Sequence, residues 1–449
     1  MIRAVIVLLC IYAVLPAAAE NRVTVFVNVN VVPMSSEVIL EQRTVVVEND
    51  KIIRIGRVDS VPVPKGAFVV DGTDRFLMPG LAEMHAHVTS TAPQQFDRLA
   101  TLFVANGVTT IRGMLGRPEH LLLRDQLADG EIFGPRLITS GPSVNGRSVS
   151  GAVDASRFVR AQHAAGYDFV KIHPGLTADE FATVASTANE LGIPFAGHVP
   201  VAAGVGAALT HRMATIDHLD GYFLTLLPAG NGGDGEFGGF FDVMLAADLE
   251  ADRIPAIAAA TAAAGTWNVA TEVLVEQIID ATPTAELRQR PEMRFISRSV
   301  VDDWVATKER QLADRDFSPE TAALAIELRR RLILQLHQAG AGLLLGSDAP
   351  QVFNVPGYSL HRELKVLVAA GLTPYEALRT GTVAVAEFLD ADTGVVATGR
   401  AADLVLLNAN PLMDISNSNR IHGVMLRGHW LPASELEARL KTYEVASGG

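Results

Sequence analysis

The stretch LMPGLAEMHAHV, residues 77–88, carries the strongest information about the fold. It is apolar and short, and it ends in the pair His85 and His87. In a β-strand, side chains two residues apart point to the same face. Neutral imidazoles placed in this way suit zinc and related cations, whose coordination is often completed by a carboxylate oxygen. The stretch therefore predicts a buried strand with a metal site at its end.

Seven further apolar runs follow this stretch, and helical stretches such as 177–191 and 318–339 lie between them. Alternation of strands and helices predicts βαβ units and a parallel sheet. Eight units favour a closed (β/α)8 TIM barrel, and an open doubly wound sheet is the alternative. The eight predicted strands are 80–87, 107–114, 135–141, 168–173, 194–199, 215–220, 266–273 and 342–348.

Metal-binding side chains recur near the C-terminal ends of these runs, where barrel enzymes hold their chemistry. They are Lys171, His198, His218 and Asp348. Taken alone, Asp348 is also compatible with a helix N-cap. A buried lysine beside cations can lose its proton and add carbon dioxide to form a carbamate that bridges two metals. An ion-paired lysine beside a single metal is the alternative.

The two ends of the chain have a different pattern. Residues 23–32, 44–48 and 51–55 are β-branched and partly alternating, and 402–408 and 421–431 are similar. Neither group has enough strands to be stable alone. We therefore expect residues 20–78 and 384–449 to form one small β domain beside a barrel of residues 79–383.

Composition limits the class of protein. The chain has 449 residues, 49% of them hydrophobic and 19% charged, as in a packed globular enzyme. A net charge of −13 argues against nucleic-acid binding. Residues 1–19 combine Arg3, an apolar run and small residues before Glu20, which predicts a signal peptide and export to the periplasm or medium. An uncleaved N-terminal anchor is the alternative; after cleavage we expect no stable membrane insertion.

Two long connections, 221–245 and 276–340, interrupt the strand–helix pattern. The first contains the glycine-rich GNGGDGEFGGFF and the second is highly charged. Both are expected to leave or cover the mouth of the barrel, because loops of this length are usually functional or mobile.

The chain resembles the amidohydrolase superfamily, in the group of imidazolonepropionase-like or prolidase-like enzymes. The resemblance spans the mature chain and rests on the motifs PGLAEMHAH (79–87), VKIH (170–173), GHVP (197–200), IDHLDGY (216–222), GSDAP (346–350), SLHREL (359–364) and GRAADLVLLNANPL (399–412). It implies that the terminal β domain is a sandwich. Glu83 departs from the family pattern, which usually has aspartate at this position, and the change could alter support of the ligands.

The resemblance also implies a ligand set. His85, His87 and Asp348 would bind one metal, His198 and His218 a second, and carbamylated Lys171 would bridge them. Some relatives use a single metal, so the resemblance allows one ion or two, which are expected to be Zn²⁺. Asp348 is expected to act as general base and then as general acid.

Three further residues are candidates for contact with the substrate. His361 is expected to act as an electrophile or substrate ligand, Tyr222 to line the pocket, and Arg112 to pair with a substrate carboxylate; each is also compatible with a purely structural role. His173 is a weaker candidate for the pocket.

These residues predict hydrolysis of a carbon–nitrogen bond in a dipeptide or N-acyl amino acid, a peptidase-like activity. A cyclic amide, amidine or lactone is the alternative substrate, and a non-catalytic metal- or ligand-binding protein is the alternative class. The expected partners are a small molecule or short peptide and, in a homo-oligomer, further copies of the chain.

Overall fold

The computed structural model describes residues 22–228, 240–314 and 317–445. Seven short parallel strands lie where the sequence predicts them in the central part of the chain. They form a three-stranded sheet in the order β6-β7-β8 and a four-stranded sheet in the order β12-β11-β10-β9. Their bounds are β6 Leu81–Ala86, β7 Val108–Gly113, β8 Arg136–Thr139, β9 Val170–Ile172, β10 Phe195–Gly197, β11 Thr215–Asp217 and β12 Trp267–Val269.

The eighth predicted run, 342–348, is not a regular strand. It is nevertheless hydrogen bonded on both sides: Leu344 N–H donates to Asn268 in β12, and Met84 N–H in β6 donates to Leu345. Isolated parallel bridges join Asn268 to Leu343 and Ala86 to Ala349. At the end of the run, Asp348 has φ 61°, outside the extended region. The result is a mixed α/β fold of the TIM-barrel type, and closure of the barrel stays a prediction.

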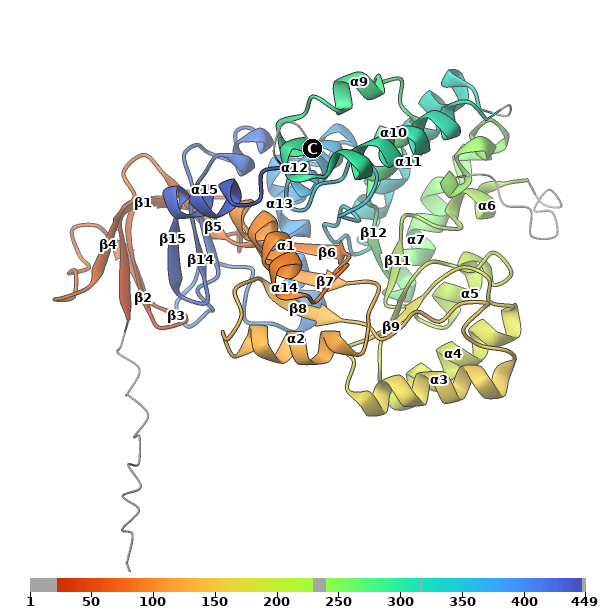
Figure 1. The fold of residues 1–449 in the computed structure, drawn as a ribbon, viewed down its shortest axis with the longest axis horizontal. Helices are drawn as coiled ribbons and strands as arrows, with labels where there is room; N and C mark the ends of the chain where they lie inside the picture. The colour runs from red at the N-terminus through yellow and green to blue at the C-terminus, as the bar shows by residue number, and fades with distance from the viewer. Residues whose placement is uncertain (1–21, 229–239, 315–316, 446–449) are drawn as a thin grey trace, which may run out of the picture.

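Helices follow the central strands and cover them, as Figure 1 shows. The predicted stretches 177–191 and 318–339 are confirmed as α4 and α11. The α-helices are α1 Pro93–Ala105, α2 Glu119–Ala128, α3 Ala152–Ala165, α4 Ala178–Leu191, α5 Gly204–Thr210, α6 Tyr222–Leu226, α7 Ile254–Ala264, α8 Glu272–Ile279, α9 Thr284–Leu287, α10 Arg298–Leu312, α11 Pro319–Gln338, α12 Tyr358–Ala369, α13 Pro374–Thr380, α14 Val383–Leu389 and α15 Ala433–Lys441. Short 3-10 helices are η1 Phe240–Asp248, η2 Ala251–Arg253, η3 Pro291–Phe295 and η4 Ile415–Asn419.

The two ends of the chain meet in one eight-stranded sheet. Its order is β15-β14-β13-β5-β1-β2-β3, with β4 paired to β1. Figure 1 places this sheet at one end of the molecule, beside the helix-rich part. The strands are β1 Val23–Val31, β2 Leu40–Glu48, β3 Lys51–Arg57, β4 Phe68–Asp71, β5 Phe76–Pro79, β13 Leu404–Leu407, β14 Ile421–Leu426 and β15 His429–Pro432. The sequence analysis missed β4 and β5, which pair parallel to β1. The pairing shows a single sheet, so the sandwich and the domain boundaries stay predictions.

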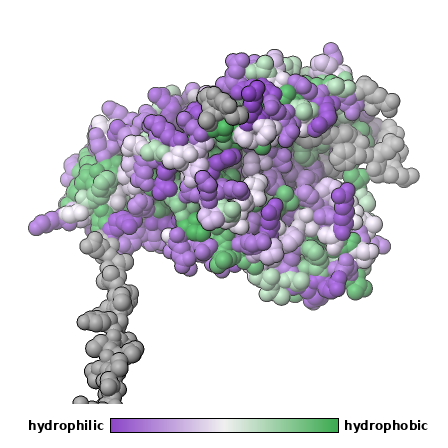
Figure 2. All heavy atoms as spheres, in the orientation of Figure 1, coloured by the Kyte–Doolittle hydropathy of each residue, from purple (hydrophilic) through white to green (hydrophobic). Residues whose placement is uncertain are grey.

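One apolar region of the surface lies on the terminal sheet. Figure 2 shows hydrophobic residues gathered at the end of the molecule that the terminal sheet occupies, where Phe68 and Val69 of β4 are 58% and 50% exposed. Within the described ranges, no helix is long and apolar enough to span a membrane. The predicted signal peptide, residues 1–19, lies outside the described residues.

The long connections contain more helix than expected. Residues 276–340 supply η3 and three complete helices, α9 to α11, and residues 221–245 supply α6 and the start of η1. Most of the glycine-rich stretch lies outside the described residues.

Candidate active site

Three of the predicted ligands converge at the ends of β6 and of the eighth run. His87 Nε2 forms a short hydrogen bond with Asp348 Oδ1, and His85 Nε2 lies 3.6 Å from the same oxygen. Ligand atoms of these three residues lie within 4.8 Å of one another, and all three residues are buried. Two imidazoles and a carboxylate in this arrangement form a site that fits a divalent transition metal.

The other two histidines adjoin this group. The His218 ring lies 4.5 Å from the His85 ring and 4.6 Å from the His198 ring, measured between ring centroids. His218 Nδ1 lies 3.8 Å from Asp348 Oδ2. The ends of β6, β10, β11 and the eighth run therefore bring five predicted ligands into one continuous cluster.

Partners outside the cluster hold the two histidines in place. His198 Nδ1 donates a short hydrogen bond to the Asp220 carboxylate, and His218 Nδ1 is 2.8 Å from the Thr271 hydroxyl. In each ring Nε2 is thereby left for a metal. Such partners fix the tautomer and the orientation of a ligating histidine.

Glu83 joins the two segments that carry the first three ligands. Its Oε1 accepts from His85 N–H at 3.0 Å and from Ser347 N–H at 2.8 Å, and Oε2 accepts from the Ser347 hydroxyl at 2.5 Å. Burial raises the pKa of Glu83 to about 8. The longer side chain that departs from the family pattern therefore reaches across to the residue before Asp348.

Lys171 lies fully buried below the cluster, next to a carboxylate that the sequence analysis did not single out. Lys171 Nζ is 3.8 Å from Asp217 Oδ2, and the same oxygen is 3.0 Å from His85 Nδ1. The other oxygen of Asp217 accepts from Arg112 at 3.3 Å and from Thr215 at 2.7 Å. Asp217 thus connects a metal ligand, the candidate carbamate lysine and a buried guanidinium.

The backbone at the site is unusual in a way that matches the ligand positions. His218 and Asp348 both have left-handed φ, 62° and 61°, a conformation that is uncommon outside glycine and clusters at functional sites. Gly197 has φ 120°, and a Cβ there would lie 2.6 Å from the Ile172 carbonyl and 2.7 Å from Lys171 Cδ. Only glycine leaves room for Lys171 at that position.

Three of the histidines favour the neutral form that metal binding requires. Burial, followed by the charge of Lys171, lowers the pKa of His198 to about 3. The same two causes hold the pKa of His85 well below its usual range, and burial does the same for His218. Burial also lowers the pKa of Lys171, against the opposing charge of Asp217.

Unsatisfied polar atoms provide an independent test of whether a cation fits. Among the described residues, the buried atoms without a hydrogen-bond partner include Lys171 Nζ, Asp217 Oδ2 and Nδ1 of both His85 and His87. Buried polar groups rarely stay unpaired in folded proteins. Of these, the amine of Lys171 points to a site that is completed by a further group, whereas His85 Nδ1 and Asp217 Oδ2 face each other at 3.0 Å.

A cavity of about 350 Å³ opens onto the cluster. His85, His87, His198, His218 and Asp348 form its floor, and His173 lines its side. The His173 ring lies 4.7 Å from the His198 ring. The weaker candidate, His173, therefore does line the pocket.

The structure does not bring the three predicted substrate contacts to this cavity. Both ring nitrogens of His361 are hydrogen bonded, Nδ1 with Ser418 and Nε2 with the Asn106 carbonyl. The Tyr222 hydroxyl bonds Thr261 and Asn268. His361 and Tyr222 are buried and saturated, so the geometry does not support their predicted roles.

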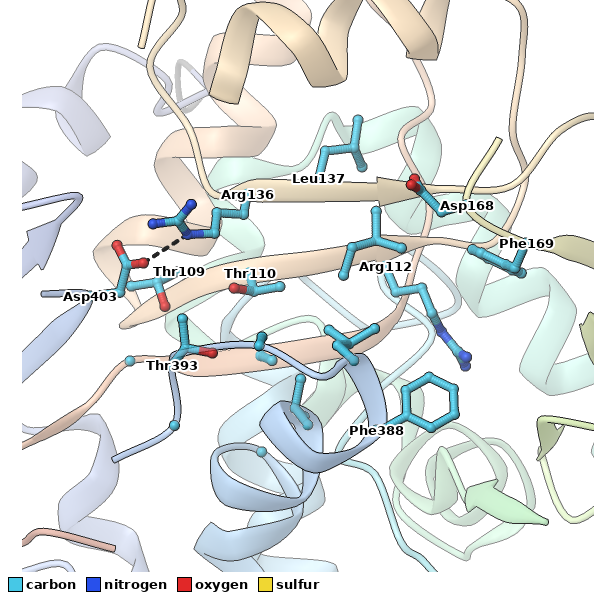
Figure 3. Close-up of a pocket in the computed structure, with 18 of the residues that line it drawn as sticks. Thr109, Thr110, Arg112, Arg136, Leu137, Asp168, Phe169, Phe388, Thr393 and Asp403 are labelled. Atoms are coloured by element: carbon cyan, nitrogen blue, oxygen red, sulfur yellow. Dashed lines mark hydrogen bonds and ion pairs between the residues drawn. The ribbon is translucent and has the colours of Figure 1, made fainter. Parts of the chain in front are cut away.

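Arg112 faces a different part of the molecule. Its guanidinium donates to the Met84 carbonyl and to Asp217, and lies 5.4 Å from the Phe169 ring centroid and 5.7 Å from that of Phe388. Figure 3 shows it beside these rings in a second cavity, about 590 Å³, at the N-terminal ends of the strands. Arg112 cannot meet a substrate carboxylate at the histidine cluster while it holds these bonds.

Sequence reasoning missed Asp217, Asp220 and Thr271. Asp217 and Asp220 flank His218 in the segment TIDHLD, which was a visible signal. No sequence signal marks Thr271, because it lies far along the chain and contacts His218 only in the folded protein.

Imidazole and carboxylate ligands at the strand ends of a parallel α/β fold define a metal-dependent hydrolase. The comparison with known families agrees: the model of the amidohydrolase family matches residues 76–431. The chain belongs to the amidohydrolase family, and it is a hydrolase that acts on carbon–nitrogen bonds. No match was found among curated proteins.

Solved structures share the fold. A putative prolidase from Bifidobacterium longum is 23% identical with a TM-score of 0.67, over 94% of this chain and 99% of that one. A bottromycin amidohydrolase is 25% identical with a TM-score of 0.72, over 95% and 91%. A Xaa-Pro dipeptidase with bound methionine in its active site is 17% identical with a TM-score of 0.66, over 91% and 100%.

Proposed function

We propose that this protein hydrolyses the amide or peptide bond of a dipeptide or N-acyl amino acid. The observation that carries the proposal is the convergence of His85, His87 and Asp348 with His198 and His218 on the floor of one cavity. Prolidase and dipeptidase structures of the same fold support the choice of substrate.

The ligands fall into two groups. His85, His87 and Asp348 would hold one divalent ion, which we propose to be Zn²⁺, and His198 and His218 a second. A metal in this position supplies Lewis-acid polarisation of the scissile carbonyl and lowers the pKa of water. The buried, unbonded amine of Lys171 supports the proposal that it carries a carbamate when both ions are present.

Asp348 is the proposed proton carrier. Its carboxylate lies at the cavity floor, in contact with His87 and close to His85. It takes a proton from the attacking water and returns it to the leaving nitrogen. His173 is the proposed contact for the substrate carbonyl, which its position in the cavity lining supports.

Three features of the protein remain proposals beside this activity. We propose that the two central sheets close into one barrel. The bridge Ser140–Phe169 supports this on one side, and Asn268–Leu343 with Ala86–Ala349 supports it on the other, where the eighth run lies between β12 and β6. We propose export through residues 1–19, and N-terminal sequencing of secreted protein beginning at Glu20 would support it. We propose a homo-oligomer that covers Phe68 and Val69; a monomeric mass in solution would oppose this.

Two experiments test the activity. Purified protein from metal-replete cells should contain one to two equivalents of a divalent transition metal, and none would contradict the site. Metal-loaded protein should then be assayed against dipeptides, N-acyl amino acids, cyclic amides and lactones. Hydrolysis of amides that is abolished by Asp348→Asn, with metal retained, is the expected result; preference for lactones would favour the alternative substrate class.

A further inference from the structure

The wall of the active-site cavity differs in character from its floor. Leu274 and Ile278, one turn apart on α8, form an apolar face with Phe241 and Val352. Phe241 lies over the floor, with its ring 5.0 Å from that of His218. The wall is therefore shaped for an apolar group placed directly above the ligands.

The polar groups on this wall are uncharged. Gln311 of α10 and Gln351, three residues after Asp348, both line the cavity. Thr307 lines it one turn before Gln311. Amide and hydroxyl groups of this kind recognise neutral donors and acceptors, and none of them neutralises a carboxylate.

Lysine and arginine are missing from the cavity lining within the described residues. Nearby cations among the described residues are directed elsewhere. Arg112 is held by Asp217, and Lys308 donates to the Gln277 carbonyl and to Asp280. Arg310 is exposed and reaches the wall only by donating to the Thr307 hydroxyl.

The composition of the glycine-rich segment does not change this balance. Residues 229–239 contain Asp234 and Glu236 and no lysine or arginine. Whatever their positions, these residues bring no positive side chain to a substrate.

We infer that the substrate is neutral around its scissile bond: an amide whose amine half carries an apolar side chain and a blocked carboxyl group, rather than a free α-carboxylate. This rests on the proposed amide hydrolysis and changes the expected substrate, because a dipeptide or an N-acyl amino acid carries a free carboxylate. A carboxylate brought against the Leu274–Ile278 face loses water without gaining an ion pair, which is costly. A carboxamide at the same point meets Gln311 or Gln351 and keeps its hydrogen bonds.

The test compares substrates that share one scissile bond. N-acetyl-leucinamide and N-acetyl-leucine share the acetyl–nitrogen bond and differ in the terminal group, which is a neutral carboxamide or a carboxylate, and N-acetyl-serinamide removes the apolar side chain. Release of acetate is measured, because the carboxamide is itself an amide. With metal-loaded full-length protein we expect kcat/KM for N-acetyl-leucinamide to exceed that of each of the others by about tenfold or more, since tenfold corresponds to one modest desolvated contact.

A positive charge placed on the cavity wall should reverse the preference for N-acetyl-leucinamide over N-acetyl-leucine. Gln311→Arg adds a guanidinium at the cavity and should raise kcat/KM for N-acetyl-leucine relative to N-acetyl-leucinamide. Gln338→Arg adds the same charge at the exposed end of α11 and should change neither value. A shift in Gln311→Arg that is absent in Gln338→Arg supports a neutral cavity wall.

The possible outcomes distinguish a failure of this inference from a failure of the proposed function. Equal rates on the acid and the amide, or a preference for the acid, overturn the inference and leave the proposed amide hydrolase standing. Unchanged discrimination in Gln311→Arg also counts against it. If metal-loaded protein hydrolyses no amide at all, the proposed function itself fails.

Discussion

Glu83 offers the sharpest test of how the site is built. Its carboxyl group is completely buried and accepts the backbone N–H groups of His85 and Ser347, which belong to different segments. Glu83→Ala removes the shared acceptor and leaves both donors without a partner. Glu83→Gln is the matched control, because its amide oxygen can still accept both.

The expected loss of stability in Glu83→Ala follows from these two hydrogen bonds. Leaving a buried donor unsatisfied costs about 1–3 kcal/mol, so Glu83→Ala should lower the free energy of unfolding by about 2–6 kcal/mol at pH 7. The Ser347 hydroxyl adds little, because it can turn to Ser359, whose oxygen is 2.8 Å away. Glu83→Gln should stay within about 1 kcal/mol of the wild type.

Metal binding gives a second readout. Glu83 accepts from the backbone of His85 and from that of Ser347, the residue before Asp348. Loss of these two hydrogen bonds should therefore weaken metal affinity by roughly 10–100-fold. Chemical denaturation of metal-free protein and titration with Zn²⁺ measure the two effects separately. If Glu83→Ala unfolds within about 1 kcal/mol of the wild type and binds Zn²⁺ equally well, the reasoning is wrong.

Three further predictions concern the same region. Because burial raises the folded-state pKa of Glu83 to about 8 from an ordinary 4.5, the folded state keeps a proton that the unfolded state loses, so the stability of metal-free protein should fall as pH rises from about 4.5 to 8. Glu83→Gln should flatten that fall in denaturation midpoints measured across the range, and an identical slope in the variant would exclude Glu83 as its source. Asp220→Asn should weaken the hold on His198 Nδ1 and lower affinity for a second Zn²⁺ by roughly 10–100-fold, with unchanged far-UV circular dichroism; a normal second binding step in calorimetry would contradict this. Gly197→Ala should displace Lys171 and reduce thermal stability, since the added Cβ meets backbone at 2.6 Å, and a melting temperature equal to wild type would show that the segment relaxes freely.

Much of the site was predictable because its signals are local. The spacing of His85 and His87 depends only on the period of a strand, and the positions of His198 and His218 follow from short apolar runs that end where they stand. Glu83 was also visible, as a departure from a motif. Its reach to Ser347 was not, since that contact joins segments far apart in the chain.

What the sequence by itself determined is the position of seven central strands, the order of the candidate metal ligands and the association of the two chain ends, because these depend on periodicity and residue type. Only the tertiary structure decided where the long side chains point. Arg112 turns to Asp217, and His361 and Tyr222 are saturated by partners far along the chain. The neutral wall of the cavity likewise comes from α8 and α10, helices whose own sequences say nothing about metal chemistry. A side chain that can rotate toward several neighbours is assigned by packing and hydrogen bonding, and neither can be read from adjacent residues.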